Sequence, residues 1–185
     1  MIHNILFSLW FFLPAGVANV TPIIVAQLPG FRNLNAPLDN GKYFRKKRIF
    51  GEHKTWRGIV CGIIVGVLLV WLQGVIFRNE AWFRNISAPL SYDSISILVL
   101  GILLSFGALF GDVLESFFKR QHNIDSGDSW FPFDQLDYVI GGLLLSIIYV
   151  RLPVIDYFWI IIIWFGMHML FSFFGYLIKL KEKPI

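Results

Sequence analysis

The sequence predicts an all-α polytopic membrane protein with about five transmembrane helices in a single integral membrane domain. Of its 185 residues, 56% are hydrophobic and 17% aromatic, and only 15% are charged; soluble domains carry roughly 25% charged residues. Five apolar runs approach the roughly 20 residues that cross the hydrocarbon core of a bilayer. The charges gather between these runs. Composition, span length and charge placement therefore agree on the class.

The five expected spans are joined by two charged loops and two short connections. The first span is about twice as long as the apolar part of a cleaved signal, and no Lys or Arg precedes it, so we interpret it as a helix. Pro14 and Pro22 are expected to kink it. The spans run over 5–28, 58–77, 95–112, 135–152 and 157–178, and the charged loops over 29–57 and 113–134.

The distribution of cations predicts the orientation in the membrane. Thirteen of the sixteen Lys and Arg residues fall on one side of the five spans, in the two charged loops and the C-terminal tail. Only Arg78, Arg84 and Arg151 remain on the other side. By the positive-inside rule, we expect a cell-membrane protein with its N-terminus outside, its C-terminus in the cytoplasm and both charged loops cytoplasmic.

Glycines spaced four residues apart mark two of the spans. Gly58, Gly62 and Gly66 form one stripe, and Gly107 and Gly111 form another. Small residues at this spacing let helix backbones approach closely in a membrane. We therefore expect the spans 58–77 and 95–112 to pack tightly together.

The first charged loop ends in GEHKTWRG, where the chain re-enters the membrane. Lys54, Thr55 and Arg57 stand there in a position to hold phosphate oxygens, Arg57 bidentately. The segment lacks the glycine spacing of a Walker A loop, and an interfacial belt of Trp, Lys and Arg is the alternative interpretation. The cluster 45–48 is explained either as an orientation signal or as an attraction for anionic lipid head groups.

Two pairs of carboxylates flank the second charged loop. Asp112 and Glu115 end one span, and Asp134 and Asp137 begin the next. Ordinary helix ends are the alternative: an acidic first turn, or a Glu115–Lys119 pair. Because both spans meet the same face of the membrane, however, the pairs share one depth and repel each other. A cation would relieve that repulsion, and oxygen ligands without His or Cys favour Mg²⁺ over Zn²⁺.

A divalent cation beside Lys119, Arg120 and a basic loop is the equipment of phosphoryl transfer. Two other hypotheses stay open at this point. A small ion-coupled transporter would use the acids as a cation site, but it predicts acids near the middle of the membrane. A non-catalytic anchor would recruit partners through its basic loop, which leaves the acidic pairs unexplained. No nucleic-acid partner is expected.

Several motifs together resemble the CDP-archaeol synthase family. They are GD, ESFFKR, DSGD and FPFDQLD between 111 and 137, LPAGVANVTPIIV in the first span, APLDNGK and GEHKTWRG in the first loop, and the ending GYLIKLKEKPI. This family shares an S-x-x-K-R and D-x-x-D signature with phosphatidate cytidylyltransferases. Ile124, Gln135 and the absence of a His-Gly-Gly before the final pair favour the archaeol-type branch.

The resemblance implies that the phosphate of a membrane lipid attacks the α-phosphorus of CTP, which gives a CDP-activated lipid and pyrophosphate for phospholipid synthesis. The lipid implied is archaetidic-acid-like: unsaturated 2,3-bis-O-geranylgeranylglycerol 1-phosphate. Glu115 and His168 are left open, as is the oligomeric state. The catalytic residues implied are Asp112, Lys119, Arg120, Asp134 and Asp137, with Asp112, Asp134 and Asp137 on Mg²⁺; those implied to bind substrate are Asp39, Lys54, Thr55, Arg57 and Ser116.

Overall fold

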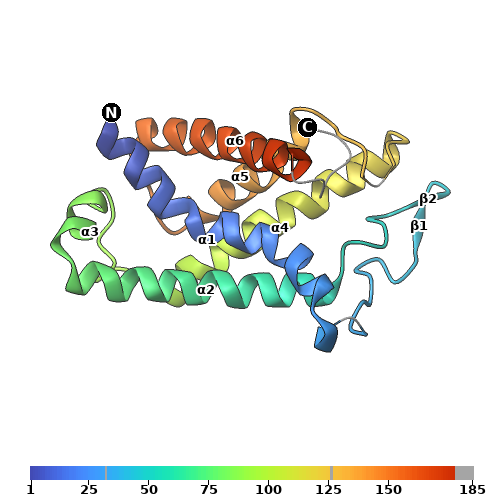
Figure 1. Cartoon of the computed structure of the whole chain (residues 1–185), viewed down its shortest axis with the longest axis horizontal. Coiled ribbons are helices and arrows are strands. Elements are labelled where there is room, and N and C mark those ends of the chain that lie inside the picture. Colours follow the sequence, from blue (N-terminus) through green and yellow to red (C-terminus); the bar gives the residue numbers. More distant parts are fainter. Residues whose placement is uncertain (32, 126, 178–185) are drawn as a thin grey trace.

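A computed structural model describes residues 1–31, 33–125 and 127–177 as a bundle of helices (Figure 1). The polytopic all-α class is confirmed, because four of these helices are long and apolar enough to cross a membrane. A shorter helix, α5, lies among them, and a six-residue helix, α3, connects α2 to α4. The helices are α1 (Ile2–Gln27), α2 (Trp56–Asn79), α3 (Ala81–Ile86), α4 (Ile97–Gln121), α5 (Phe133–Ser146) and α6 (Val154–Leu177).

The fourth expected span is a shorter helix than the sequence suggests. α5 has 14 residues, about 21 Å of helix, and turns at 147–149 complete the path. Tyr149 then accepts a hydrogen bond from the Ser96 backbone N–H at the start of α4 (2.6 Å). The chain thus returns to the end of the bundle where α4 begins, but four long helices do not by themselves establish five spans.

α1 supplies much of the core of the bundle. It is one continuous helix through Pro14 and Pro22, and it packs against α2, α4, α5 and α6. Phe12 is fully buried and meets the ring of Trp164 on α6 at 5.6 Å. The Tyr138 hydroxyl on α5 donates a hydrogen bond to the Trp164 carbonyl (2.9 Å). α1 therefore fixes α5 and α6 relative to each other.

The glycine stripes bring three helices together. The expected packing of α2 against α4 is present, and Gly66 lies directly against Ser105. The second stripe faces elsewhere, because Gly107 and Gly111 lie against the backbone of α5 around Gly141. A side chain at any of these three positions would collide with backbone atoms of the opposite helix. The closest approach in the bundle is thus between α4 and α5.

α4 continues well past the predicted end of its span at residue 112. It runs to Gln121, so the second charged loop covers only 122–132. Glu115, Ser116 and Lys119 are buried along its last turns, because they continue the face that packs into the bundle. The acidic and basic residues of this segment therefore stand on helices rather than in a loop.

The first charged loop carries a small hairpin, β1 (Tyr43–Phe44) paired with β2 (Lys47–Arg48). Arg45 and Lys46 form its two-residue turn with positive φ angles of 49° and 65°, as tight hairpin turns require. Lys47 donates to the Gln121 carbonyl (2.5 Å), and Arg48 pairs with Asp39 (2.9 Å). Lys47 thus holds the loop to the end of α4, and Arg48 holds the loop together internally.

Candidate active site

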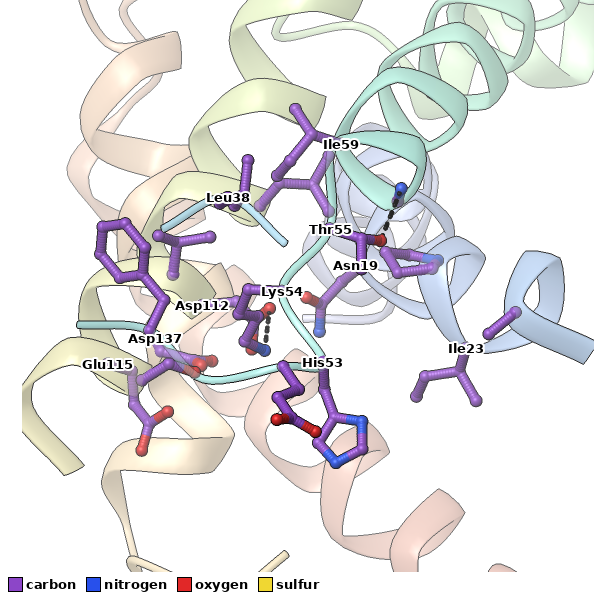
Figure 2. A pocket seen from close by; sticks show the side chains of 18 of the residues that line it. Asn19, Ile23, Leu38, His53, Lys54, Thr55, Ile59, Asp112, Glu115 and Asp137 are labelled. Atoms are coloured by element: carbon purple, nitrogen blue, oxygen red, sulfur yellow. Dashed lines mark hydrogen bonds and ion pairs between the residues drawn. The ribbon is translucent and has the colours of Figure 1, made fainter. Parts of the chain in front are cut away.

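A cavity of about 740 Å³ opens where the two charged loops meet the bundle. Its walls come from α1, α2, α4, α5 and the segment 50–55. Figure 2 shows Asp112, Glu115 and Asp137 on one side, with Asn19 and Thr55 on the other. The acids and the re-entry segment therefore line the same cavity, and their joint function as one site stays a prediction.

Three carboxylates converge on this cavity. One oxygen each from Asp112, Glu115 and Asp137 lies within 4.8 Å of the other two. Asp112 and Glu115 stand one turn apart on α4, and Asp137 is in the first turns of α5. The close contact between Gly111 and the Asp137 backbone brings the third acid into place. Packing of α4 on α5 therefore builds the cluster.

The cluster has the chemistry of a site for a hard divalent cation. Mg²⁺ takes oxygen ligands at 2.0–2.1 Å, so opposed ligand oxygens are about 4.2 Å apart. Adjacent ligands of the same octahedral ion are about 3 Å apart, so the three side chains, whose oxygens lie within 4.8 Å of one another, would have to draw together to share one ion. Two like charges about 4 Å apart also cost about 4 kcal/mol at an effective dielectric of 20. A bound Mg²⁺ would remove this repulsion.

Lys54 already neutralises one member of the cluster. Its ammonium lies 2.6 Å from the Asp112 carboxylate and reaches it from the first charged loop (Figure 2). Burial disfavours the charged amine, but the Asp112 carboxylate outweighs this effect and raises the pKa of Lys54 above its ordinary value. Lys54 therefore stays cationic at the edge of the cavity.

Lys119 joins α4 to the start of α5. Its ammonium donates to Asp134 (2.8 Å) and to the Asp128 carbonyl (2.6 Å), and it lies 3.6 Å from Glu115. Asp134 also accepts from the Trp130 backbone N–H (2.8 Å). Asp134 thus stands beside the carboxylate cluster rather than in it, and Glu115 occupies the third place. The assignment of Asp134 as a metal ligand remains a prediction.

Two guanidinium groups also line the cavity. Arg57 donates to the Phe31 carbonyl (2.6 Å), and the buried Nε atoms of Arg57 and Arg120 have no hydrogen-bond partner within the described part of the chain. Thr55 caps α2 by accepting from the Gly58 N–H (3.2 Å), and Ser116 is on the cavity wall. Donors for an anion are thus present on both sides of the acids.

Asp39 has a different position from the other predicted substrate-binding residues, because it does not line the cavity. It accepts hydrogen bonds from Arg48 and from three backbone N–H groups, at Gly41, Phe50 and Gly51. Burial alone would raise the pKa of Asp39, but these donors lower it to about 2. Its observed role is to hold the first loop in shape; substrate contact remains a prediction.

The structure adds residues that the sequence-based site omitted. Asn19 of α1 and His53 line the cavity, and so does His168 of α6. The Asn19 Oδ1 atom is buried and accepts no hydrogen bond from any described residue. An amide inside an apolar span is costly unless it is used, and that cost is a signal in the sequence by which Asn19 could have been found.

The whole chain, residues 1–185, matches the family described as CarS-like, CDP-archaeol synthase. It is 35% identical over 147 residues to a CDP-archaeol synthase of Thermococcus onnurineus, covering 78% of this chain and 76% of that protein. A relative of the same name from Pyrococcus abyssi is 32% identical over 179 residues and 96% of both chains.

Among solved structures, one is described as an intramembrane enzyme for archaeal membrane lipids biosynthesis. It resembles this fold with a TM-score of 0.69 and 23% identity, over 89% of this chain and 91% of that one. At that identity, the likeness concerns the fold alone.

Proposed function

Because this chain belongs to the CDP-archaeol synthase family, we propose that its substrate is unsaturated 2,3-bis-O-geranylgeranylglycerol 1-phosphate. The family makes it a CTP-dependent lipid cytidylyltransferase, and a lipid phosphate and CTP are its partners. The proposal for the lipid rests on the name shared by its archaeal relatives. The single observation that supports the chemistry is that the carboxylate cluster shares one cavity with Lys54, Arg57 and Arg120.

Asp112, Glu115 and Asp137 are the residues proposed to hold Mg²⁺. When bound there, the ion would supply positive charge that offsets the charge developing on the leaving pyrophosphate. Asp134 is proposed to act through Lys119, whose ammonium it orients at 2.8 Å. The sequence-based alternative, with Asp134 in place of Glu115, makes a different prediction that is tested below.

The reaction proposed for this site is an in-line displacement. An oxygen of the lipid phosphate attacks the α-phosphorus of CTP, and a new P–O bond forms. The bond from the α-phosphorus to the bridging oxygen breaks, and its electron pair leaves with pyrophosphate. Because the attacking oxygen is already anionic at neutral pH, no side chain has to remove a proton.

The cationic side chains divide between the two substrates in this proposal. Lys119 and Arg120, on the last turns of α4, neutralise the triphosphate during transfer. Lys54 and Arg57, at the start of α2, anchor the lipid phosphate. The Nε atom of Arg57 has no hydrogen-bond partner among the described residues, so it can donate to that phosphate. Ser116 and Thr55 supply further polar contacts from the walls. Positioning and charge neutralisation account for most of the catalysis in such reactions.

The site is proposed to face the cytoplasm, with α5 as a fifth, short crossing. Cytoplasmic CTP could then reach the cavity, while the lipid stays in the bilayer. This orientation is supported by the charge bias, since the hairpin with Arg45 and Lys46 lies at the same end of the bundle as the cavity (Figure 1). The family assignment favours this enzyme over the transporter and the anchor.

Purified protein supplied with labelled CTP, Mg²⁺ and a lipid phosphate tests the proposal. We expect a labelled CDP-lipid with the geranylgeranyl ether phosphate, and at most slow turnover with a saturated diacyl phosphatidic acid. Equal turnover of both lipids would contradict the substrate assignment. Absence of product from every lipid phosphate would contradict the function itself.

A further inference from the structure

A second cavity, of about 520 Å³, lies in the groove between α4 and α5. Its lining is almost wholly apolar and includes Phe110, Leu114, Ile140 and Leu144. On α5, Leu144 is 62% exposed and Ile140 is 46% exposed. The neighbouring α4 is long and apolar enough to span a membrane. Such a surface belongs in hydrocarbon, so a lipid chain is the chemistry that fits this groove.

The floor of the groove is backbone rather than side chains. Gly111 and Gly141 line it, and each would collide with the opposite helix if it carried a side chain. Large side chains stand on both sides of this floor, among them Phe110 and Leu114 on α4. The result is a groove with a backbone floor and apolar side chains beside it.

The groove meets the polar cavity at two carboxylates. Glu115 and Asp137 line both of them, and both belong to the carboxylate cluster. A molecule with its phosphate in the cavity and an apolar tail at this junction would place that tail along α4 and α5. We propose that the α4–α5 groove binds one hydrocarbon chain of the lipid phosphate and selects it by shape. This inference rests on the proposed function.

Selection by shape, rather than affinity, follows from the surroundings of the groove. Bilayer chains are as apolar as its lining, so moving a chain from the bilayer into the groove gains little hydrophobic free energy. The groove can instead hold the chain in a fixed direction, which places the phosphate near Glu115 and Asp137. Orientation of this kind affects how often a bound lipid is productively placed.

A competing path for the hydrocarbon chain exists on the wall of the polar cavity that lies away from the carboxylates. Ile23 of α1 and Ile59 of α2 border the polar cavity there, on the side of Asn19 and away from the acids in Figure 2. Ile23 is 63% exposed, so a chain could also leave the cavity by that route. The α4–α5 groove is preferred because it adjoins the carboxylates directly.

Bulky substitutions in the groove provide the kinetic test in purified full-length protein. Leu144→Trp and Ile140→Trp should lower kcat/KM for the geranylgeranyl lipid phosphate at least about tenfold and leave the KM for CTP unchanged, since they obstruct the chain and not the cavity. Ile140 is three residues from Asp137, about 4.5 Å along α5, so a lipid phosphate with chains of about two carbons ends before the obstruction and should be turned over almost normally. That turnover also shows that the variants are folded.

Matched controls carry the same change elsewhere. Leu170 lies on an exposed face of α6 and lines neither cavity, so Leu170→Trp should leave kcat/KM for the lipid and the KM for CTP unchanged. Ile23→Trp tests the competing path. The groove proposal is overturned if Ile23→Trp lowers kcat/KM for the long-chain lipid while Leu144→Trp and Ile140→Trp do not.

Photo-crosslinking separates this inference from the proposed function, because labelling does not require turnover. A lipid phosphate with a photoreactive group at the end of one chain should label peptides of α4 and α5, and Leu144→Trp should abolish that label. Labelling of α1 or α2 alone would refute the groove. So would labelling of α4 and α5 that is no stronger in the wild-type protein than in Leu144→Trp. If the wild-type protein is labelled there but forms no CDP-lipid, the function fails and the groove stands.

Discussion

At the scale of single residues, the two lysines of the cavity already have partners that a substrate would have to replace. Lys54 is bonded to Asp112, and Lys119 to Asp134. Mg²⁺ on Asp112 would compete with Lys54 for the same carboxylate. The released ammonium would then be free for a phosphate. This exchange predicts that metal binding and substrate binding are linked through Lys54.

Replacing Lys54 separates these two roles. Lys54→Met should lower kcat by about 100-fold, the usual cost of one charge-stabilising donor, whereas affinity for Mg²⁺ should stay the same or increase because Asp112 loses its competitor. Turnover and Mg²⁺ titration of the purified variant measure the two effects. Lys42→Met, an exposed lysine in the same loop, is the control. A weaker affinity for Mg²⁺ in Lys54→Met would mean that Lys54 orients Asp112 for the metal instead.

Asp39 should make the first loop sensitive to acid. Its folded pKa of about 2 lies below the ordinary value of 3.8, so its ionised form stabilises the fold above about pH 4. That contribution is lost as pH falls from about 4 to about 2. Asp39→Asn should remove most of the pH dependence in this window and destabilise the protein by about 1–3 kcal/mol. Thermal unfolding in detergent at several pH values measures both, and an unchanged pH profile in Asp39→Asn would contradict the assignment.

The residues of the site were predictable where helical spacing and family motifs agreed. Asp112, Asp137, Lys54, Thr55 and Arg57 all line the cavity as expected. The sequence could not choose between Glu115 and Asp134, because that choice depends on how α4 and α5 are rotated about their axes. Asn19 was overlooked since a single amide in an apolar span gives no spacing pattern.

At the scale of elements, the contact between α4 and α5 determines the site. It brings Asp137 to Asp112 and Glu115, and it forms the floor of the apolar groove. The glycine spacing indicated a close contact, but its partner was α5 rather than α2 for Gly107 and Gly111. Spacing alone identifies a smooth face on a helix and does not identify the helix that covers it.

Gly111→Ala should therefore weaken the metal site from a distance. Its methyl group would meet backbone atoms of α5 at Asp137, and such overpacking costs about 1–3 kcal/mol. As α5 shifts away, the Mg²⁺ concentration for half-maximal activity should rise. Gly166→Ala is the matched control, because nothing lies within 4 Å of its added carbon; it should leave activity intact. Equal behaviour of the two variants would contradict the role given to the α4–α5 contact.

Helix ends were the least predictable feature of the elements. α4 passes its predicted end by nine residues, at 121 instead of 112, because hydropathy falls where the charged site begins although the helix continues. α5 ends at Ser146 rather than at 152. The C-terminal lysines used for the charge count lie outside the described residues, so their part in the orientation stays a prediction.

At the scale of the whole molecule, the orientation follows from placing both charged loops at one end of the bundle. Single cysteines introduced into a Cys61→Ser background test it. A membrane-impermeant maleimide should label Glu80→Cys from outside intact cells, and Lys46→Cys, in the exposed hairpin turn, only after permeabilisation. The Cys61→Ser protein itself should stay unlabelled. The reverse pattern would place the cavity on the outer face and contradict the proposed access of cytoplasmic CTP.

The central claim is that Asp112, Glu115 and Asp137 form the Mg²⁺ site for cytidylyl transfer, and the Mg²⁺ dependence of CDP-lipid formation tests it most directly. Even an outer partner of a metal ligand is worth about 10–100-fold in affinity or activity, so Glu115→Gln should raise the Mg²⁺ requirement at least about tenfold. Asp134→Asn, which loosens Lys119, should lower kcat with little change in that requirement. A raised requirement in Asp134→Asn, with a normal one in Glu115→Gln, would contradict the account.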